Sequence, residues 1–387
     1  MPEPDAAYLS ETLSQLVQIN SVNPAFDPGA PGEAPIADWI SGELERLGCS
    51  VLRREPRRGR VSVAGTLAGC GGGPSLMLYG HIDTVGVEGM ADPWSGRIEA
   101  GRLYGRGSYD MKCGVAACLG AVKALRDGGT RLKGDVVLCA VADEETESIG
   151  MSDLLQAVQT DAAIVTEPTE LAVCVAHKGF CWLEVETVGH AAHGSRYQDG
   201  VDANLRMGRV LAELEILERR VRGSRAHPLL GPPSLHAAVL RGGTGLSTYA
   251  ASSVLQIERR TVPGESPATV LAEVEAILQQ LRDEDPTFEA KARLLLARPS
   301  LEGSADSEIA RAVTTAATRR LGRAPVVSGA AYWMDAALIA EAGIETVVIG
   351  PSGTGAHAAV EWVELESVNQ VTAILADAAV AYCGVAG

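Results

Sequence analysis

The sequence lacks several features that would place it in a familiar class. None of its eight cysteines forms a CxxC pair, which argues against a zinc ribbon or a thioredoxin-type motif. No apolar run approaches the roughly 20 residues of a membrane-spanning helix. Positive charge is scarce, and a formal net charge of -16 argues against a nucleic-acid partner. The N-terminus also lacks the pattern of a signal peptide, so we expect a cytoplasmic protein with reduced thiols.

What is present predicts a large globular chain. Its 387 residues are 46% hydrophobic, which suggests two domains or one domain with a large insertion. Strands alternate with helices over the first 166 residues, a pattern typical of an α/β domain with a mostly parallel sheet. From about residue 179 the expected order becomes βαββαβ, that of a split βαβ sandwich. The predicted fold class is α/β: a mixed, mostly parallel sheet domain (1–178 and 294–387) with an inserted α+β domain (179–293).

The segment Leu78-Tyr79-Gly80-His81-Ile82-Asp83 is the most informative. An apolar strand stops at a glycine, and a histidine and a carboxylate follow two residues apart. In an extended chain, positions i and i+2 face the same way. The Asp83 carboxylate would therefore orient the His81 imidazole and raise its basicity as a metal ligand. A histidine at a strand end is also common as a purely structural residue, so this segment decides nothing alone.

Four further segments place potential ligands at the ends of apolar strands or in loops beside helices. These ligands are Asp110, Glu145, Glu167 and His357. Open α/β sheets bind ligands beyond the carboxyl ends of their strands. Together with His81 they predict a binuclear site, since two imidazoles and three carboxylates suit zinc, cobalt or manganese. The plainer alternatives are a helix cap for Asp110 and a turn at Glu167-Pro168.

The adjacent residues Glu144 and Glu145 indicate two different roles, one in metal binding and one in proton transfer. Adjacent side chains at a strand end point in different directions, so one carboxylate can bind a metal while the other faces the metal-bound water. A metal lowers the pKa of that water to about 7, and a carboxylate can then accept its proton. We therefore interpret Glu145 as a ligand and Glu144 as the general base and acid. The alternative is a solvated surface pair.

With these motifs in order, the chain resembles the M20 metallopeptidases. The resemblance covers nearly the whole sequence and is strongest to the branch of acetylornithine deacetylase and succinyl-diaminopimelate desuccinylase. It is carried by five matching segments: Gly80-His81-Ile82-Asp83-Thr84-Val85, Gly105-Arg106-Gly107 with Asp110-Met111-Lys112, Glu144-Glu145, Glu167-Pro168, and Gly350-Pro351 followed by His357.

The resemblance implies two divalent ions, most often Zn²⁺, with Co²⁺ or Mn²⁺ as alternatives. It implies that His81 and Glu167 bind one ion, that Glu145 and His357 bind the other, and that Asp110 bridges the two. In the same way it implies that Asp83 orients His81 and that Glu144 is the catalytic base.

The resemblance also gives the inserted domain a role as a lid and dimerisation domain, so we expect a homodimer. His193, in Ala192-His193-Gly194-Ser195, would then stabilise the oxyanion in a partner's active site. Arg260 would bind a substrate carboxylate through its guanidinium fork. Without the resemblance, both would be interpreted as surface residues. The segment Ser247-Thr248-Tyr249-Ala250 departs from the usual family pattern on the substrate side.

The function predicted on this basis is that of a zinc-dependent amidohydrolase. It would cleave the amide of an N-acylated amino acid, with acetylornithine deacetylase or succinyl-diaminopimelate desuccinylase as the nearest examples. One alternative is an M20 dipeptidase or carboxypeptidase acting on small peptides. Another is a metal-binding protein that has lost catalysis. No nucleic-acid or membrane partner is expected.

Overall fold

The chain forms two compact units. The computed structural model describes residues 2–387. The first unit contains the chain up to residue 175 together with 303–328 and 334–387, and the second contains 176–302 and 329–333. The boundaries suggested by the sequence, at 178/179 and 293/294, remain a prediction of where the domains divide.

A mixed sheet forms the centre of the first unit, in the order β1-β2-β6-β3-β7-β15-β8. Strands β6, β3, β7 and β15 run parallel to one another, while β1, β2 and β8 are antiparallel to their neighbours. This confirms the predicted α/β class with a mixed, mostly parallel sheet. The strands are β1 (Ser50–Arg57), β2 (Arg60–Leu67), β3 (Leu76–His81), β6 (Val136–Val141), β7 (Ala162–Val165), β8 (Val173–His177) and β15 (Glu345–Val348). The end of β8 continues into the second unit, where the short strand β13 (Leu301–Glu302) pairs with it, and the short strand β14 (Val327–Ala330) also pairs with β8.

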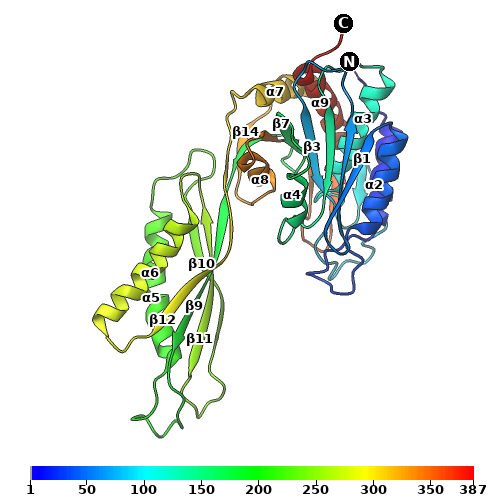
Figure 1. Ribbon diagram of the computed structural model, residues 1–387. Helices are drawn as coiled ribbons and strands as arrows, with labels where there is room; N and C mark the ends of the chain where they lie inside the picture. The colour runs from blue at the N-terminus through cyan, green and yellow to red at the C-terminus, as the bar shows by residue number, and fades with distance from the viewer. Residues whose placement is uncertain (1) are drawn as a thin grey trace. The chain divides into compact units, whose positions relative to one another are not determined.

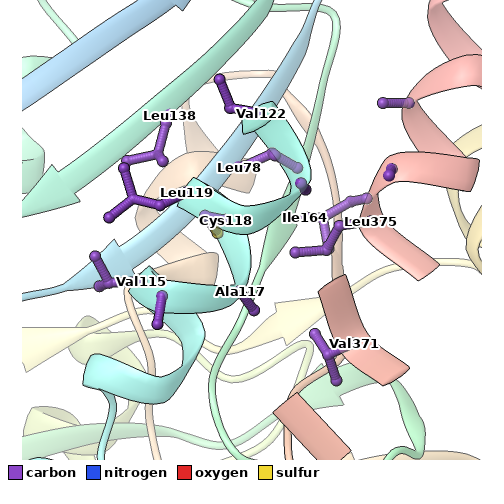
Figure 2. Packing of buried hydrophobic residues seen from close by; sticks show 14 of the residues in the cluster. Leu78, Val115, Ala117, Cys118, Leu119, Val122, Leu138, Ile164, Val371 and Leu375 are labelled. Atoms are coloured by element: carbon purple, nitrogen blue, oxygen red, sulfur yellow. The ribbon is translucent and has the colours of Figure 1, made fainter. Parts of the chain in front are cut away.

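Helices cover both faces of this sheet (Figure 1). One face carries α1 (Ala6–Gln18), α2 (Ala34–Arg46), α3 (Lys112–Asp127), α7 (Glu308–Leu321) and α9 (Leu365–Cys383), and the other carries α4 (Ile149–Leu154) and α8 (Ala336–Glu341). Figure 2 shows Leu119 and Val122 of α3 packed among Leu78 and Leu138 of the strands. Alternate strand residues enter this cluster because successive side chains of a strand point to opposite faces.

Helix α9 has no counterpart among the elements predicted from the sequence. Its buried residues lie on nearly every side, from Ser367 and Val368 to Tyr382 and Cys383. A helix that is apolar all round shows no polar stripe and therefore gives a weak periodic signal. It packs against α3 and α7 and completes the core of the first unit.

A small antiparallel sheet, also not predicted, lies in the loops of the first unit. Its order is β16-β17-β5-β4, with bounds β4 (Ile98–Glu99), β5 (Arg102–Tyr104), β16 (Gly353–Thr354) and β17 (Trp362–Glu364). His357 lies in the loop between β16 and β17, and Asp110 follows β5. The sheet therefore joins two segments that carry predicted ligands, although they are far apart in the sequence.

The second unit has the predicted βαββαβ order. Its elements are β9 (Gly179–Val188), α5 (Ala203–Arg222), β10 (Ser234–Gly242), β11 (Ser252–Thr261), α6 (Pro267–Glu284) and β12 (Ala290–Arg298). The sheet is antiparallel in the order β10-β11-β9-β12, and α5 and α6 cover one face of it (Figure 1). Side chains of Asp202 and Ser266 cap the two helices at their N-termini. Among the described residues, no helix of either unit has the length and apolarity to span a bilayer.

Candidate metal centre

His81 ends strand β3 and is fully buried. The glycine before it allows α3 to pack closely, because a Cβ on Gly80 would lie 2.8 Å from Cγ2 of Val115. The His81 Nδ1 lies 3.0 Å from the main-chain oxygen of Asp83. A carbonyl can only accept, so Nδ1 is the donor, and the Nε2 atom is the one available to a metal.

Asp110 lies between two imidazoles. Its Oδ1 is 3.2 Å from Nε2 of His81, and its Oδ2 is 3.3 Å from Nε2 of His357. Each imidazole also faces a second carboxylate: Glu167 Oε1 is 3.6 Å from His81, and Glu145 Oε2 is 3.1 Å from His357. The structure thus brings together all five predicted ligands, in two sets that share Asp110.

Glu144 lies at the edge of this cluster. Its Oε2 is 4.0 Å from Nε2 of His81, and the side chain is almost entirely buried. One ligand atom from each of His81, Glu144 and Glu167 falls within 4.8 Å of the others, as does one from each of His81, Asp110 and Glu145. Geometry alone is therefore compatible with Glu144 as a ligand or as a base beside the ligands.

The side chains present fit bound cations. Ligand nitrogen and oxygen atoms of these kinds suit divalent zinc, cobalt or manganese. Oε1 of Glu145 is buried and has no hydrogen-bond partner among the described residues, which leaves it available to a cation. Buried carboxylates are costly unless positive charge or hydrogen bonds compensate them. Here the two imidazoles face three such carboxylates, so a further positive charge is needed for balance.

Without a cation, the imidazoles take up protons. Hydrogen bonds that the carboxylates of Asp110 and Glu145 accept from the His357 imidazole raise the pKa of His357 to about 10. Burial lowers the pKa of His81, but the carboxylates of Glu167 and Asp110 outweigh it and hold that pKa well above its usual range. Protonated imidazoles and metal cations thus compensate the same carboxylates.

Burial raises the pKa of Glu144 well above its usual value. The neighbouring carboxylate of Glu167 raises it further, against the opposing effect of His81. A carboxyl with a raised pKa is better able to hold a proton near neutral pH, which is what a general acid and base requires.

The Asp83 carboxylate holds the loop that carries the two glutamates. It accepts hydrogen bonds from the main-chain N–H groups of Glu144 at 3.1 Å and Glu145 at 3.2 Å. It also accepts one from Nδ2 of Asn23 at 2.9 Å. Its distance to Nδ1 of His81 is longer, at 3.5 Å. Asp83 therefore acts on His81 mainly through its main-chain oxygen and on the glutamate loop through its side chain.

A buried ionic network behind Asp83 was not found from the sequence. The guanidinium of Arg60 lies 2.6 Å from both Glu33 Oε1 and Asp143 Oδ1. It also donates to Oδ1 of Asn23 at 2.9 Å, and Asn23 links the network to Asp83. The only sequence signal was an arginine at the start of strand β2, and its partners lie far away in the sequence.

Glu361 is another residue near the site that was not predicted from the sequence. It lies four positions after His357 and is buried. Its carboxylate accepts hydrogen bonds from the main chain of the Asp110 loop, including the N–H of Asp110 itself at 3.0 Å.

The two other predicted site residues belong to the second unit. His193 is exposed, and its Nδ1 lies 2.8 Å from Oγ of Ser195. Arg260 is on β11, where Nε donates to Glu258 Oε1 at 2.6 Å and the guanidinium lies 5.4 Å from the ring centre of Phe180. Arg260 is thus partly exposed but already has a carboxylate partner.

Comparison with known proteins relates the chain to hydrolases. Residues 77–381 match peptidase family M20/M25/M40. The chain is 30% identical to acetylornithine deacetylase of Myxococcus xanthus, over 97% of this chain and 98% of that protein. It is 28% identical to N-formyl-4-amino-5-aminomethyl-2-methylpyrimidine deformylase of Bacillus subtilis (strain 168), over 97% and 96%. The YXEP protein of Bacillus subtilis, described as a dinuclear metal binding peptidase from the M20 family, has a TM-score of 0.75 and 17% identity over 97% of each chain, a likeness of fold.

Proposed function

The chain belongs to peptidase family M20/M25/M40, and on this premise we propose that it is a two-metal hydrolase that cleaves the amide bond of an N-acylated amino acid. The observation that carries the proposal is the position of Asp110 between His81 and His357, each with a further carboxylate. The similarity to an acetylornithine deacetylase and to a deformylase supports an N-acyl substrate.

In this proposal His81 and Glu167 would hold one cation, Glu145 and His357 would hold the second, and Asp110 would contribute to both. The dinuclear site named for the YXEP protein supports the count of two. Zn²⁺ suits this donor set, with Co²⁺ or Mn²⁺ as alternatives. When bound, the cations would polarise the scissile carbonyl and lower the pKa of a water molecule to about 7.

The remaining steps belong to the protein's own groups. The Asp83 main-chain oxygen fixes Nδ1–H of His81 and so keeps Nε2 directed at Asp110. The Asp83 carboxylate fixes the main chain of Glu144. Glu144 accepts the proton of the attacking water at its carboxylate and donates it to the leaving amine.

The second unit supplies substrate contacts in this proposal. The Arg260 guanidinium would bind the substrate's carboxylate in a bidentate fork, in exchange for its present partner Glu258. His193 would stabilise the oxyanion in the other subunit of a homodimer. We further propose that the enzyme acts in the cytoplasm.

A panel of substrates tests the function. The protein would be stripped with a chelator, reconstituted with zinc, cobalt or manganese, and assayed for amine release from N-acetyl, N-succinyl and N-formyl amino acids and from dipeptides. We expect cation-dependent release from N-acyl amino acids, with the chelated protein as the control.

Cleavage of dipeptides alone would favour the second candidate, an M20 dipeptidase or carboxypeptidase, which the peptidase description of the YXEP protein supports. Two bound cations without cleavage of any substrate in the panel would contradict the proposal. That result would favour a metal-binding protein without catalysis.

A further inference from the structure

The carboxylate of Glu361 is surrounded by four hydrogen-bond donors. Oε1 accepts from the main-chain N–H groups of Tyr109 at 2.9 Å and Asp110 at 3.0 Å. Oε2 accepts from the N–H of Gly107 at 3.1 Å and from Nη1 of Arg106 at 2.6 Å. Both of its oxygens are therefore committed to one loop, which ends at the residue between the two imidazoles.

Arg106, in the Asp110 loop, binds the main chain of the loop that carries His357. Its Nη2 donates to the main-chain oxygen of Ala358 at 3.1 Å, and Ala358 directly follows His357. Its Nε donates to the main-chain oxygen of Gly86 at 2.9 Å. A carboxylate from the His357 loop thus holds the Asp110 loop, and a guanidinium from the Asp110 loop holds the His357 loop.

This pair is buried on both sides. The exposed fraction of the side chain is 3% for Arg106 and 0% for Glu361. Burying an ion pair costs desolvation free energy, which is recovered only when the remaining donors and acceptors are also satisfied. Glu361 meets that condition through three main-chain N–H groups. A buried ion pair often adds little to the free energy of unfolding, so stability does not explain why this pair lies between two ligand loops.

The two loops require such a constraint. Asp110 and His357 lie outside helices and strands, and loops open locally more readily than core elements. The distance from Asp110 Oδ2 to His357 Nε2 is 3.3 Å, and a cation must fit between these two groups. Partners of metal ligands that fix ligand orientation commonly change metal affinity or activity by about 10–100-fold when they are removed.

We propose that Glu361, paired with Arg106, is a positioning residue that fixes Asp110 relative to His357 and so sets the affinity for the cation these two ligands share. The inference rests on the proposed function, because it assigns Glu361 to one half of the two-metal site.

Glu361→Gln tests the proposal. All four partners of Glu361 are donors, so an amide would direct its own N–H₂ group at one pair of them. We expect calorimetric titration with zinc to show one of two cations bound about 10–100-fold more weakly, while the other, which Asp110 contacts but His357 does not, loses less affinity. kcat should fall at limiting zinc and recover as zinc is raised, whereas KM should change little. The matched control is Glu364→Gln, three positions away and exposed, which should behave as the wild type.

Two results would overturn the proposal. One is wild-type affinity for both cations in Glu361→Gln. The other is equal weakening of both cations together with a lower melting temperature, which would make Glu361 a general structural residue. If Glu361→Gln fails to fold, Arg106→Lys decides in its place, since lysine keeps the charge but loses the fork that reaches Ala358. A wild-type protein that binds no cation would overturn the proposed function as well.

Discussion

The main-chain N–H of Glu144 donates a hydrogen bond to the carboxylate of Asp83 at 3.1 Å. The same carboxylate accepts from the N–H of Glu145 and from the side chain of Asn23. All three partners are donors, so only a group with two acceptor oxygens satisfies them. The end of β3 and the loop after β6 are thereby held together at the point where the predicted ligand and base lie.

Asp83→Asn should therefore lower kcat by about 10–100-fold, since the new amide directs a donor at one of these donors. Steady-state kinetics at saturating zinc measure the effect. Asp92→Asn, in an exposed loop of the same unit, is the control. A kcat equal to that of the wild type would refute a positioning role for Asp83.

Replacing Glu144 with glutamine should separate catalysis from metal binding. Loss of the base should lower kcat by about 10²–10⁴-fold, because a positioned general base contributes on that order. Atomic absorption should still find two cations per chain. Glu147→Gln, on the same loop but half-exposed, should keep full activity. If Glu144→Gln loses a cation, Glu144 is a ligand and not a base.

Cation affinity should rise with pH. In the metal-free protein, Asp110 and Glu145 raise the pKa of His357 to about 10, so its imidazole is protonated at neutral pH. A cation needs the neutral imidazole, and binding must release that proton. Titration in a weakly buffered solution should detect the released protons, and affinity should increase as pH rises towards 10. A constant affinity over that range would contradict this.

The raised pKa of His357 also makes the stability of the metal-free fold depend on pH. The pKa of His357 in the folded state lies above its unfolded value. Its contribution to stability is therefore fully present below about pH 6.5 and lost as the pH rises through about 10. His357→Gln should remove that part of the pH dependence from a series of thermal melts.

Arg60→Met should destabilise the first unit by about 3–5 kcal/mol, because it leaves the buried carboxylates of Glu33 and Asp143 without their cationic partner. Urea unfolding of the metal-free protein measures this. Arg58→Met, two positions away and exposed, should change the free energy of unfolding very little. A similar small change in both variants would mean that the network adds nothing to stability.

A shared active site predicts complementation between inactive variants. Equal amounts of His193→Ala and Glu144→Gln chains, refolded together, should regain up to about a quarter of the wild-type rate, since random pairing leaves one intact site in each mixed dimer. Each variant refolded alone is the control. No gain in a mixed dimer verified by mass spectrometry would show that His193 does not act in the partner's site.

The features that could be predicted from the sequence are those that depend on short segments. The strand before His81 and the order of the βαββαβ insertion follow from local periodicity, and the structure has both. The five predicted ligands lie together in the structure, while their roles remain predictions. Helix α9 was missed because it is apolar on nearly every side.

The supporting contacts could not be predicted in this way. Arg106 and Glu361 are 255 positions apart, and Asn23 and Asp143 are 120 apart. Each residue alone resembles an ordinary surface charge or turn residue. Only folding shows that these side chains are buried and which main-chain groups they hold, because pairs this distant leave no periodic signal in one sequence.

The position of β15 has a consequence for how the chain is made. This strand lies between β7 and β8, although β8 ends at His177 and β15 begins at Glu345. At about 5–20 residues per second, a ribosome needs about 10–30 s to add the roughly 170 residues between them. During that interval the edges of β7 and β8 that will receive β15 present unpaired N–H and C=O groups, which invite association with other chains. Newly made chains are therefore exposed to aggregation at these edges until β15 (Glu345–Val348) has emerged.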